Sequence, residues 1–355
     1  MYIKKLELEN FRNYKKEVFE FCPEKNIIYG LNGQGKTNII EAIYFFVNGK
    51  SYRTSRDNEV INFESDFCKI KILFNDGIRD NKGEIIIKNK KIITVNDIPL
   101  EKLSEIIGFI NIVIFTPDTL SIVKDGPGVR RQFLDILISQ LKPVYFKTLL
   151  NYYKVLINKN NILKRKNKSE LSTISVWNEK LAEYGTIISK YRYDMIKKIN
   201  EIIKTIQFDN INENLEIEYI SGIKNDFCDK NEFLKQLEKN ISKEVEKGIT
   251  LIGPQRDDFE IKMNGNSLKK YGSQGQIRTS VLKLKLTECE IIKQSTGKNP
   301  IMLLDDILSE LDINRKEFFM KKIEDMQIFI TCTQKENNDK NTKYFYIEKG
   351  KLKEW

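Results

Sequence analysis

The residues that most directly indicate chemistry are GLNGQGKT, at positions 30–37. They match the phosphate-binding pattern G-x-x-x-x-G-K-[ST] and stand between a short apolar run and a stretch with helical spacing. The glycines let the backbone turn sharply and approach phosphate, and the start of the following helix favours an anion. Lys36 is then placed for the β- and γ-phosphates of a nucleoside triphosphate, and the Thr37 hydroxyl for Mg²⁺. The predicted nucleotide-binding residues, in preference to an ordinary glycine turn, are Gly30, Leu31, Asn32, Gly33, Gln34, Gly35, Lys36, Thr37 and Asn38.

A second candidate for chemistry is NPIMLLDD, at positions 299–306. Its four apolar residues indicate a buried parallel strand, which we expect beside the strand that leads into the phosphate-binding loop. Asp305, at the carboxyl end of that strand, is placed to hold Mg²⁺ together with Thr37. Asp306 is placed to orient the attacking water and is the predicted catalytic carboxylate. A capped strand end would also carry aspartate, so this prediction depends on the loop at 30–37.

A third polar turn, YGSQGQIRTS at positions 271–280, leads into a long helical stretch. Ser273, Gly275 and Gln276 would form a second phosphate-facing surface at the start of that helix. One nucleotide already held by Lys36 and Thr37 has no ready use for a second such surface on the same subunit. We therefore predict a two-fold dimer in which Ser273 acts on the nucleotide of the partner copy. The alternative is a helix N-cap without a ligand.

Composition limits the classes of protein that these residues can belong to. The chain has 355 residues, and 60 lysines and arginines against 50 acids give a net charge of +10, which permits a polyanionic partner. It has no histidine, so nucleophilic systems that use a Ser–His or Cys–His pair are excluded. Its five scattered cysteines fit reduced thiols, and no apolar run approaches about 18 residues, the length of a membrane span. These features predict a cytoplasmic protein.

The hydrophobic periodicity divides the chain into three parts. Alternating strand patterns surround the phosphate-binding loop up to residue 124, helical patterns dominate 125–248, and strand patterns return over 249–355. We read this as one α/β domain split by a mostly helical insertion. Within the insertion, we expect breaks between helices at Pro143, at an exposed loop over 158–168 and at Gly185.

Six segments in this order carry a family resemblance: ENFRNYKKEVFEF, GKSYRTS, TPDTLSIVKDGPGVRRQFLD, GPQRDDFEI, GSQGQIRTSVLKLKLTE and LLDDILSELD. Together they resemble the ABC-type ATPase heads of the SMC-like DNA-repair family, over essentially the whole chain. The resemblance implies a P-loop ATPase head, with a mixed β lobe and a parallel-sheet lobe, and an inserted helical arm or lid. It also implies ATP and Mg²⁺ as cofactors, Ser273 as the signature serine, and residues 309–312 as a D-loop at the dimer interface.

Three positions depart from the pattern of that family or of its wider class. Tyr52, in GKSYRTS, stands where the family usually has a histidine. Asp306 stands where ABC ATPases usually have a glutamate, and its carboxylate is shorter by about one C–C bond, ~1.5 Å. ITCT, at 330–333, stands where many of them have a switch histidine. Because catalysis by positioning is sensitive to such displacements, we predict a weak, DNA-stimulated ATPase that works as a switch.

The resemblance implies a role in recombinational repair and at replication forks. An ATP-induced dimer would clamp double-stranded DNA near single-strand gaps and junctions, and would help to load RecA together with RecR and RecO. An ATPase subunit associated with a transporter or a nuclease is the alternative. Candidate DNA contacts in the loop after the P-loop helix are Lys50, Arg53 and Arg56. A second basic group, which is a solvated face in the alternative interpretation, comprises Lys154, Lys159, Lys164, Arg165, Lys166 and Lys168.

Overall fold

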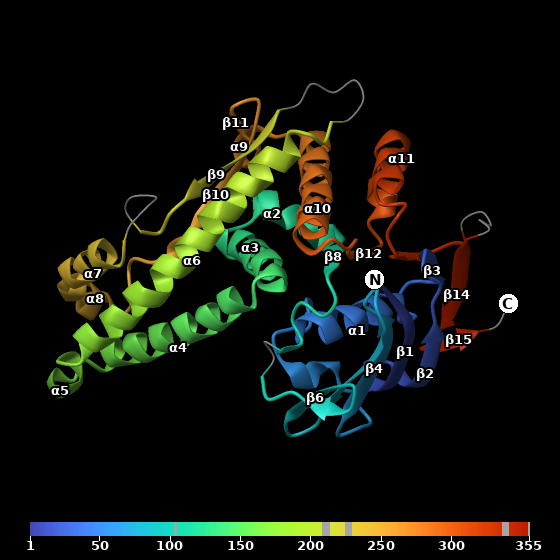
Figure 1. The fold of residues 1–355 in the computed structure, drawn as a ribbon, viewed down its shortest axis with the longest axis horizontal. Coiled ribbons are helices and arrows are strands. Elements are labelled where there is room, and N and C mark those ends of the chain that lie inside the picture. Colours follow the sequence, from blue (N-terminus) through green and yellow to red (C-terminus); the bar gives the residue numbers. More distant parts are fainter. Residues whose placement is uncertain (103–104, 208–213, 224–228, 336–340, 354–355) are drawn as a thin grey trace. The chain divides into compact units, whose positions relative to one another are not determined.

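The computed structural model describes residues 1–102, 105–207, 214–223, 229–335 and 341–353 (Figure 1). The chain forms two compact units: Met1–Leu120 together with Arg278–Trp355, and Ser121–Ile277. Residues 249–277, whose strand pattern predicts a part of the ATPase head, fall in the second unit. The reason is strand pairing, because β10 (Asp258–Met263) pairs along its length with β9 (Leu215–Ile220) of the insertion.

The first unit contains an antiparallel sheet with the strand order β2-β1-β4-β5-β6-β7. Burial alternates along β4, where Cys68, Ile70, Ile72 and Phe74 are buried and the residues between them are partly exposed. This one-sided burial is the outcome that the alternating sequence patterns predict. The strands are β1 (Tyr2–Phe11), β2 (Tyr14–Glu20), β4 (Cys68–Asn75), β5 (Asp80–Ile87), β6 (Lys91–Val95) and β7 (Ile98–Pro99).

A mostly parallel sheet forms the other layer of the first unit, in the order β15-β14-β3-β13-β12-β8. Its strands are β3 (Lys25–Tyr29), β8 (Ile112–Phe115), β12 (Ile301–Asp305), β13 (Ile328–Cys332), β14 (Thr342–Glu348) and the antiparallel edge strand β15 (Lys351–Lys353). All five residues of β12 are buried, as the apolar run predicts. The prediction that β12 lies beside the P-loop strand β3 is wrong, because β13 pairs with both of them. The crossover helix α11 (Ile313–Lys322) leads from β12 to β13.

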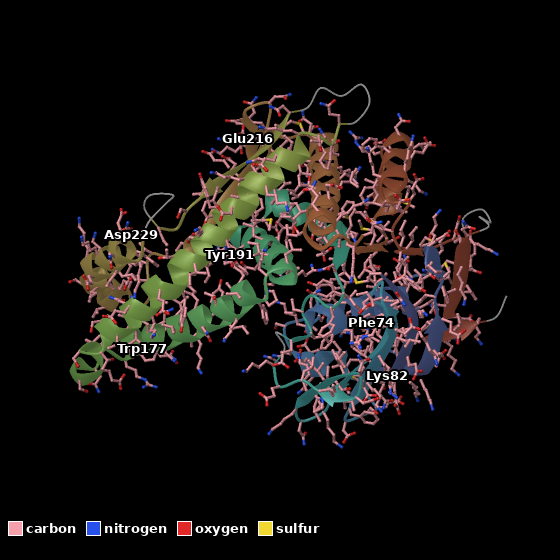
Figure 2. All side chains as sticks on the ribbon, in the orientation of Figure 1. Phe74, Lys82, Trp177, Tyr191, Glu216 and Asp229 are labelled. Carbon is pink, nitrogen blue, oxygen red and sulfur yellow. The ribbon has the colours of Figure 1, made fainter. Side chains whose placement is uncertain are left out.

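The core of the first unit joins the two sheets through aromatic rings. Phe21, just after β2, lies 4.7 Å from Phe329 of β13 and 5.3 Å from Phe345 of β14, measured between ring centroids. Helix α1 (Lys36–Asn48) packs on the antiparallel sheet, where Phe46 lies 6.4 Å from Phe74 (labelled in Figure 2). This packing fixes the helix that follows the phosphate-binding loop.

The second unit consists of helices and a small antiparallel sheet, β11-β10-β9. Its two longest helices, α4 (Pro143–Arg165) and α6 (Ile174–Ile203), lie side by side (Figure 1). Trp177 and Tyr191 of α6 are labelled in Figure 2, and the ring of Tyr191 packs edge-on against Tyr145 of α4. The other elements are α2 (Ser121–Lys124), α3 (Pro127–Leu141), α5 (Lys168–Leu171), α7 (Lys230–Lys239), α8 (Ile241–Lys247), α9 (Leu268–Tyr271) and β11 (Asn266–Ser267). None of the helices among the described residues is long and apolar enough to cross a membrane.

Of the three predicted breaks in the helical insertion, the one at Gly185 is wrong, and the one at 158–168 is shorter than predicted, because only residues 166–167 separate α4 from α5. Pro143 does begin a helix, but α4 continues without interruption through most of the loop predicted at 158–168. Helix α6 also runs straight through Gly185. A Cβ at Gly185 would lie 2.6 Å from Cε1 of the buried Phe233 in α7, so the glycine serves close packing and does not end the helix.

Candidate nucleotide-binding site

The phosphate-binding loop connects β3 to α1 in a conformation that depends on glycine. The φ angles of Gly30 and Gly35 are 144° and 115°, values that residues with a side chain rarely adopt. A Cβ at Gly30 would lie 2.4 Å from the carbonyl oxygen of Ile347, and one at Gly35 would lie 2.6 Å from Nδ2 of Asn13. Glycine is therefore required at these two positions of the motif for two reasons: the backbone angle, and the lack of room for a side chain.

Neighbouring turns hold this loop in place from two sides. From the β1–β2 turn, Asn13 Nδ2 donates to the Gln34 carbonyl (3.0 Å), and the Tyr14 hydroxyl donates to the Gly35 carbonyl (3.0 Å). From the β14–β15 turn, the Gly350 amide donates to the same Gln34 carbonyl (2.9 Å). With its carbonyls engaged in this way, the loop is fixed at the start of α1, where backbone N–H groups favour an anion.

Lys36, the first residue of α1, folds back over the loop. Its Nζ donates to the carbonyls of Gly30 (2.7 Å) and Leu31 (2.9 Å). Burial lowers the pKa of the Lys36 ammonium, and the negative charge of Asp306 opposes that effect. The ammonium thus lies inside the loop that the sequence predicts to surround phosphate.

Asp305 is the centre of the predicted metal site and is only 6% exposed. Its Oδ1 accepts hydrogen bonds from the hydroxyls of Thr37 (2.9 Å) and Thr331 (2.7 Å). Its Oδ2 accepts from the Tyr52 hydroxyl (3.1 Å). Carboxylate and hydroxyl oxygens suit Mg²⁺, which needs few protein ligands when phosphate oxygens complete its shell, so Thr37 and Asp305 fit the predicted ion.

Asp306 follows directly and has the left-handed backbone angle φ 53°. Its amide donates to the Thr331 hydroxyl (2.9 Å), which in turn donates to Asp305. Aspartate tolerates this conformation better than most residues, and the turn leaves the Asp306 side chain exposed beside the buried Asp305. Thr331 of β13 therefore links the backbone positions of the two predicted active carboxylates.

Three residues of this site were not predicted from the sequence: Thr331, Tyr52 as a partner of Asp305, and Glu41. Glu41 is fully buried on α1, where it binds Arg12 (2.6 Å), Ser51 (2.5 Å) and Arg53 (3.1 Å). A single acid inside the apolar helix IIEAIYFF was the signal that could have identified it, because a buried carboxylate needs charged or hydrogen-bonding partners. Its partners come from the β1–β2 turn and the loop after α1, so their identity depends on the fold.

The predicted signature residues begin helix α10 (Gln274–Thr296). Ser273 and Gln276 form a reciprocal cap, in which the Gln276 amide donates to Ser273 Oγ (3.2 Å) and the Ser273 amide donates to Gln276 Oε1 (3.0 Å). Ser273, Gly275 and Gln276 belong to the second unit, whereas Lys36, Thr37, Asp305 and Asp306 belong to the first. The role of Ser273 toward a partner's nucleotide remains a prediction.

The predicted D-loop, residues 309–312, lies between β12 and α11 and is anchored within the first unit. Glu310 forms an ion pair with Arg278 of α10 (2.6 Å). Asp312 caps α11 by accepting a hydrogen bond from the Arg315 amide (3.0 Å). The D-loop is thus tied both to the helix that follows the signature turn and to the helix that leads to β13.

The candidate DNA contacts differ in how free they are to bind phosphate. Lys50 and Arg56 are exposed, whereas the guanidinium of Arg53 is half-exposed and paired with Glu41. In the second group, the prediction that Lys159 contacts DNA is wrong. Its side chain is fully buried and forms an ion pair with Glu244 (2.6 Å). Burial lowers its pKa, and the Glu244 charge opposes that shift. Exposed members of the group are Lys154, Lys164, Arg165 and Lys166, and the side chain of Lys168 lies outside the described residues.

This fold and this site define the class of ABC/SMC-type ATP-binding heads. A family model described as RecF/RecN/SMC N terminal domain matches residues 2–353. The DNA replication and repair protein RecF of Acetivibrio thermocellus is 43% identical over 366 residues, which cover 99% of each chain. RecF of Clostridium perfringens is 43% identical over 363 residues, again with 99% coverage of both chains. The chain belongs to the RecF family of DNA replication and repair proteins.

Solved structures agree with this assignment. A structure of the recombination mediator protein RecF with ATP, from the RecFOR pathway, has a TM-score of 0.92 and 38% identity, and the match covers 99% of this chain and 97% of that one. A crystal structure of an SMC head bound to a domain of ScpA has a TM-score of 0.56 at 18% identity, which shows likeness of fold alone. The α/β head with a helical insertion, predicted from the sequence, is confirmed.

Proposed function

We propose that this chain is an ATP-dependent DNA-binding protein of recombinational repair. ATP joins two copies into a clamp on double-stranded DNA, and slow hydrolysis releases it. The observation that carries this proposal is the assembled group of Lys36, Thr37, Asp305 and Asp306, within a chain 43% identical to RecF. Phosphoryl transfer relies on positioning and charge stabilisation, which is what such a group offers.

Each residue of the group has a distinct part in the proposed reaction. The loop amides and Lys36 bind the β- and γ-phosphates, and Thr37 and Asp305 hold Mg²⁺. When bound, Mg²⁺ neutralises charge on the phosphates. Asp306 orients the attacking water, and its short side chain keeps hydrolysis slow.

The dimer is proposed from the predicted roles of the signature turn and the D-loop. Ser273, with Gly275 and Gln276, contacts the nucleotide held by Lys36 of the other copy, and residues 309–312 cross the interface. Each copy alone then carries two half-sites, so nucleotide binding and dimerisation depend on each other.

Family membership and the basic side chains support the proposed DNA and protein partners. Lys50 and Arg56 bind the phosphate backbone of double-stranded DNA near gaps and junctions, without reading bases. RecR and RecO are the proposed protein partners, in line with the RecFOR pathway named for the similar structure, and RecA is loaded as the result.

Particle size measured with ATP, with ADP and without nucleotide tests this proposal. We expect dimers with ATP alone, because only the triphosphate completes both half-sites. Lys36→Ala should stay monomeric because it loses ATP binding, whereas Ser273→Arg should bind ATP and still remain monomeric. Monomers of the wild-type chain in all three conditions would contradict the central claim.

A further inference from the structure

Tyr52 lies in the loop that follows α1, and its side chain has two contacts. Its ring packs edge-on against Tyr44 of α1, with 5.1 Å between the centroids. Its hydroxyl lies 3.1 Å from Oδ2 of Asp305. The Tyr52 hydroxyl is the donor of this hydrogen bond, because an ionised carboxylate can only accept.

The two oxygens of Asp305 are held by different residues. Thr37 and Thr331 both donate to Oδ1, and Tyr52 donates to Oδ2. Thr37 is a proposed ligand of Mg²⁺, so its hydroxyl would bind the ion as well as Asp305 when Mg²⁺ is present. Tyr52 and Thr331 are the donors that remain on Asp305, one on each oxygen, and together they fix the rotation of the carboxylate.

The backbone on both sides of Tyr52 is anchored to α1. Ser51 Oγ donates to Glu41 (2.5 Å) and also accepts from the Arg53 amide (2.9 Å). The Arg53 guanidinium reaches Glu41 (3.1 Å) and Asn38 (2.9 Å). The loop is therefore clamped before and after Tyr52, and the helix that begins in the phosphate-binding loop sets where the Tyr52 hydroxyl lies.

We propose that Tyr52 is a positioning residue for the metal carboxylate, which sets the affinity of the nucleotide-bound site for a divalent cation. The inference rests on the proposed function, because it concerns the Mg²⁺ that accompanies ATP. With Tyr52 in place, Asp305 is held in one orientation and does not have to reorient when the cation binds. Hydrogen-bond partners that orient a metal ligand typically change metal affinity by about 10- to 100-fold.

The test is divalent-cation binding by the full chain, measured with Mn²⁺ and its electron paramagnetic resonance signal, in the presence of ATPγS. Tyr52→Phe should raise the Mn²⁺ dissociation constant about 10-fold. Its affinity for ATPγS in EDTA should stay within about two-fold of wild type, because the phosphate-binding loop is untouched. Tyr44→Phe is the matched control, since it makes the same chemical change next to Tyr52, and it should leave Mn²⁺ binding unchanged.

Tyr52→His separates hydrogen bonding from packing. An imidazole N–H can donate to Oδ2, so this variant should recover Mn²⁺ affinity to within about three-fold of wild type. Wild-type Mn²⁺ affinity in Tyr52→Phe would overturn the inference, and so would equal losses in the Phe and His variants. If the wild-type chain showed no cation-dependent binding of ATPγS, the proposed function itself would fail, which is a distinguishable result.

Discussion

At the scale of single residues, the site is a set of hydroxyl groups arranged around one buried carboxylate. Thr37, Thr331 and Tyr52 come from three separate segments and all donate to Asp305. Asp306 has φ 53° and an exposed side chain, and no hydroxyl group of the described residues donates to its carboxylate. This contrast matches the proposed roles, because a metal ligand must be held still and a residue that orients water must be accessible.

Asp306 is therefore the residue whose change should affect hydrolysis most selectively. Asp306→Asn keeps the size of the side chain but removes the charge that can orient and deprotonate water. We expect single-turnover ATP hydrolysis to fall by about 10²- to 10⁴-fold, with ATP affinity changed less than three-fold. ATP-dependent dimers should persist longer than in wild type, and hydrolysis at the wild-type rate would show that another group orients the water.

At the scale of elements, helix α6 contains a glycine, Gly185, that close packing requires and that backbone angle does not. Gly185 faces Phe233 of α7 and Pro254, with a hypothetical Cβ at 2.6 Å and 3.3 Å from their nearest atoms. Phe233 is fully buried and cannot move aside freely. The packing of α7 on α6 thus depends on the missing side chain.

Gly185→Ala should destabilise the chain although alanine is the better helix former. Overpacking costs about 1–3 kcal/mol, against a gain of about 1 kcal/mol in helix propensity. Chemical denaturation should show the net loss, and Phe233→Leu combined with Gly185→Ala should lose less than the sum of the single changes. Gly128→Ala is the matched control, because Gly128 is an exposed glycine of α3 and an added Cβ there would lie 4.0 Å from its nearest neighbour, Arg131. Phe233→Leu alone completes the set of single changes. A stabilised Gly185→Ala variant would refute the packing explanation.

At the scale of the whole molecule, the excess of positive charge is consistent with a DNA partner but does not say which surface binds it. Two groups of exposed basic side chains compete, Lys50 and Arg56 in the first unit and Lys154 and Lys164 in the second. Arg53 is a poor probe because its guanidinium also anchors the loop to Glu41. Charge reversal of the two pairs can distinguish the surfaces.

We expect Lys50→Glu with Arg56→Glu to weaken binding to duplex DNA and to reduce the salt dependence of log K by about one unit for each lost phosphate contact. The matched variant, Lys154→Glu with Lys164→Glu, changes the net charge equally and should have the smaller effect. Binding isotherms in the presence of ATP at several salt concentrations measure both quantities. The reverse order of effects would assign the DNA surface to helix α4.

Local patterns were enough to predict several parts of this protein. The phosphate-binding loop, the buried strand ending in Asp305 and the helical nature of the insertion each depend on residues close together in the chain. Their spacing constrains the backbone directly, through glycine angles, apolar runs and helical periodicity. The order of the strands could not be predicted in this way, because strands that pair are far apart in the sequence. In the structure, β13 lies between β12 and β3.

By itself, the sequence determined that this chain carries a phosphate-binding loop, a strand ending in paired aspartates and a large helical insertion. Only the tertiary structure decided which side chains surround them. In it, Thr331 and Tyr52 donate hydrogen bonds to Asp305. Glu41 forms ion pairs with Arg12 and Arg53, and Lys159 forms a buried ion pair with Glu244. Such contacts join residues as far as 253 positions apart. Burial and hydrogen bonding act on neighbours in space, and neighbours in space are set by how sheets and helices pack.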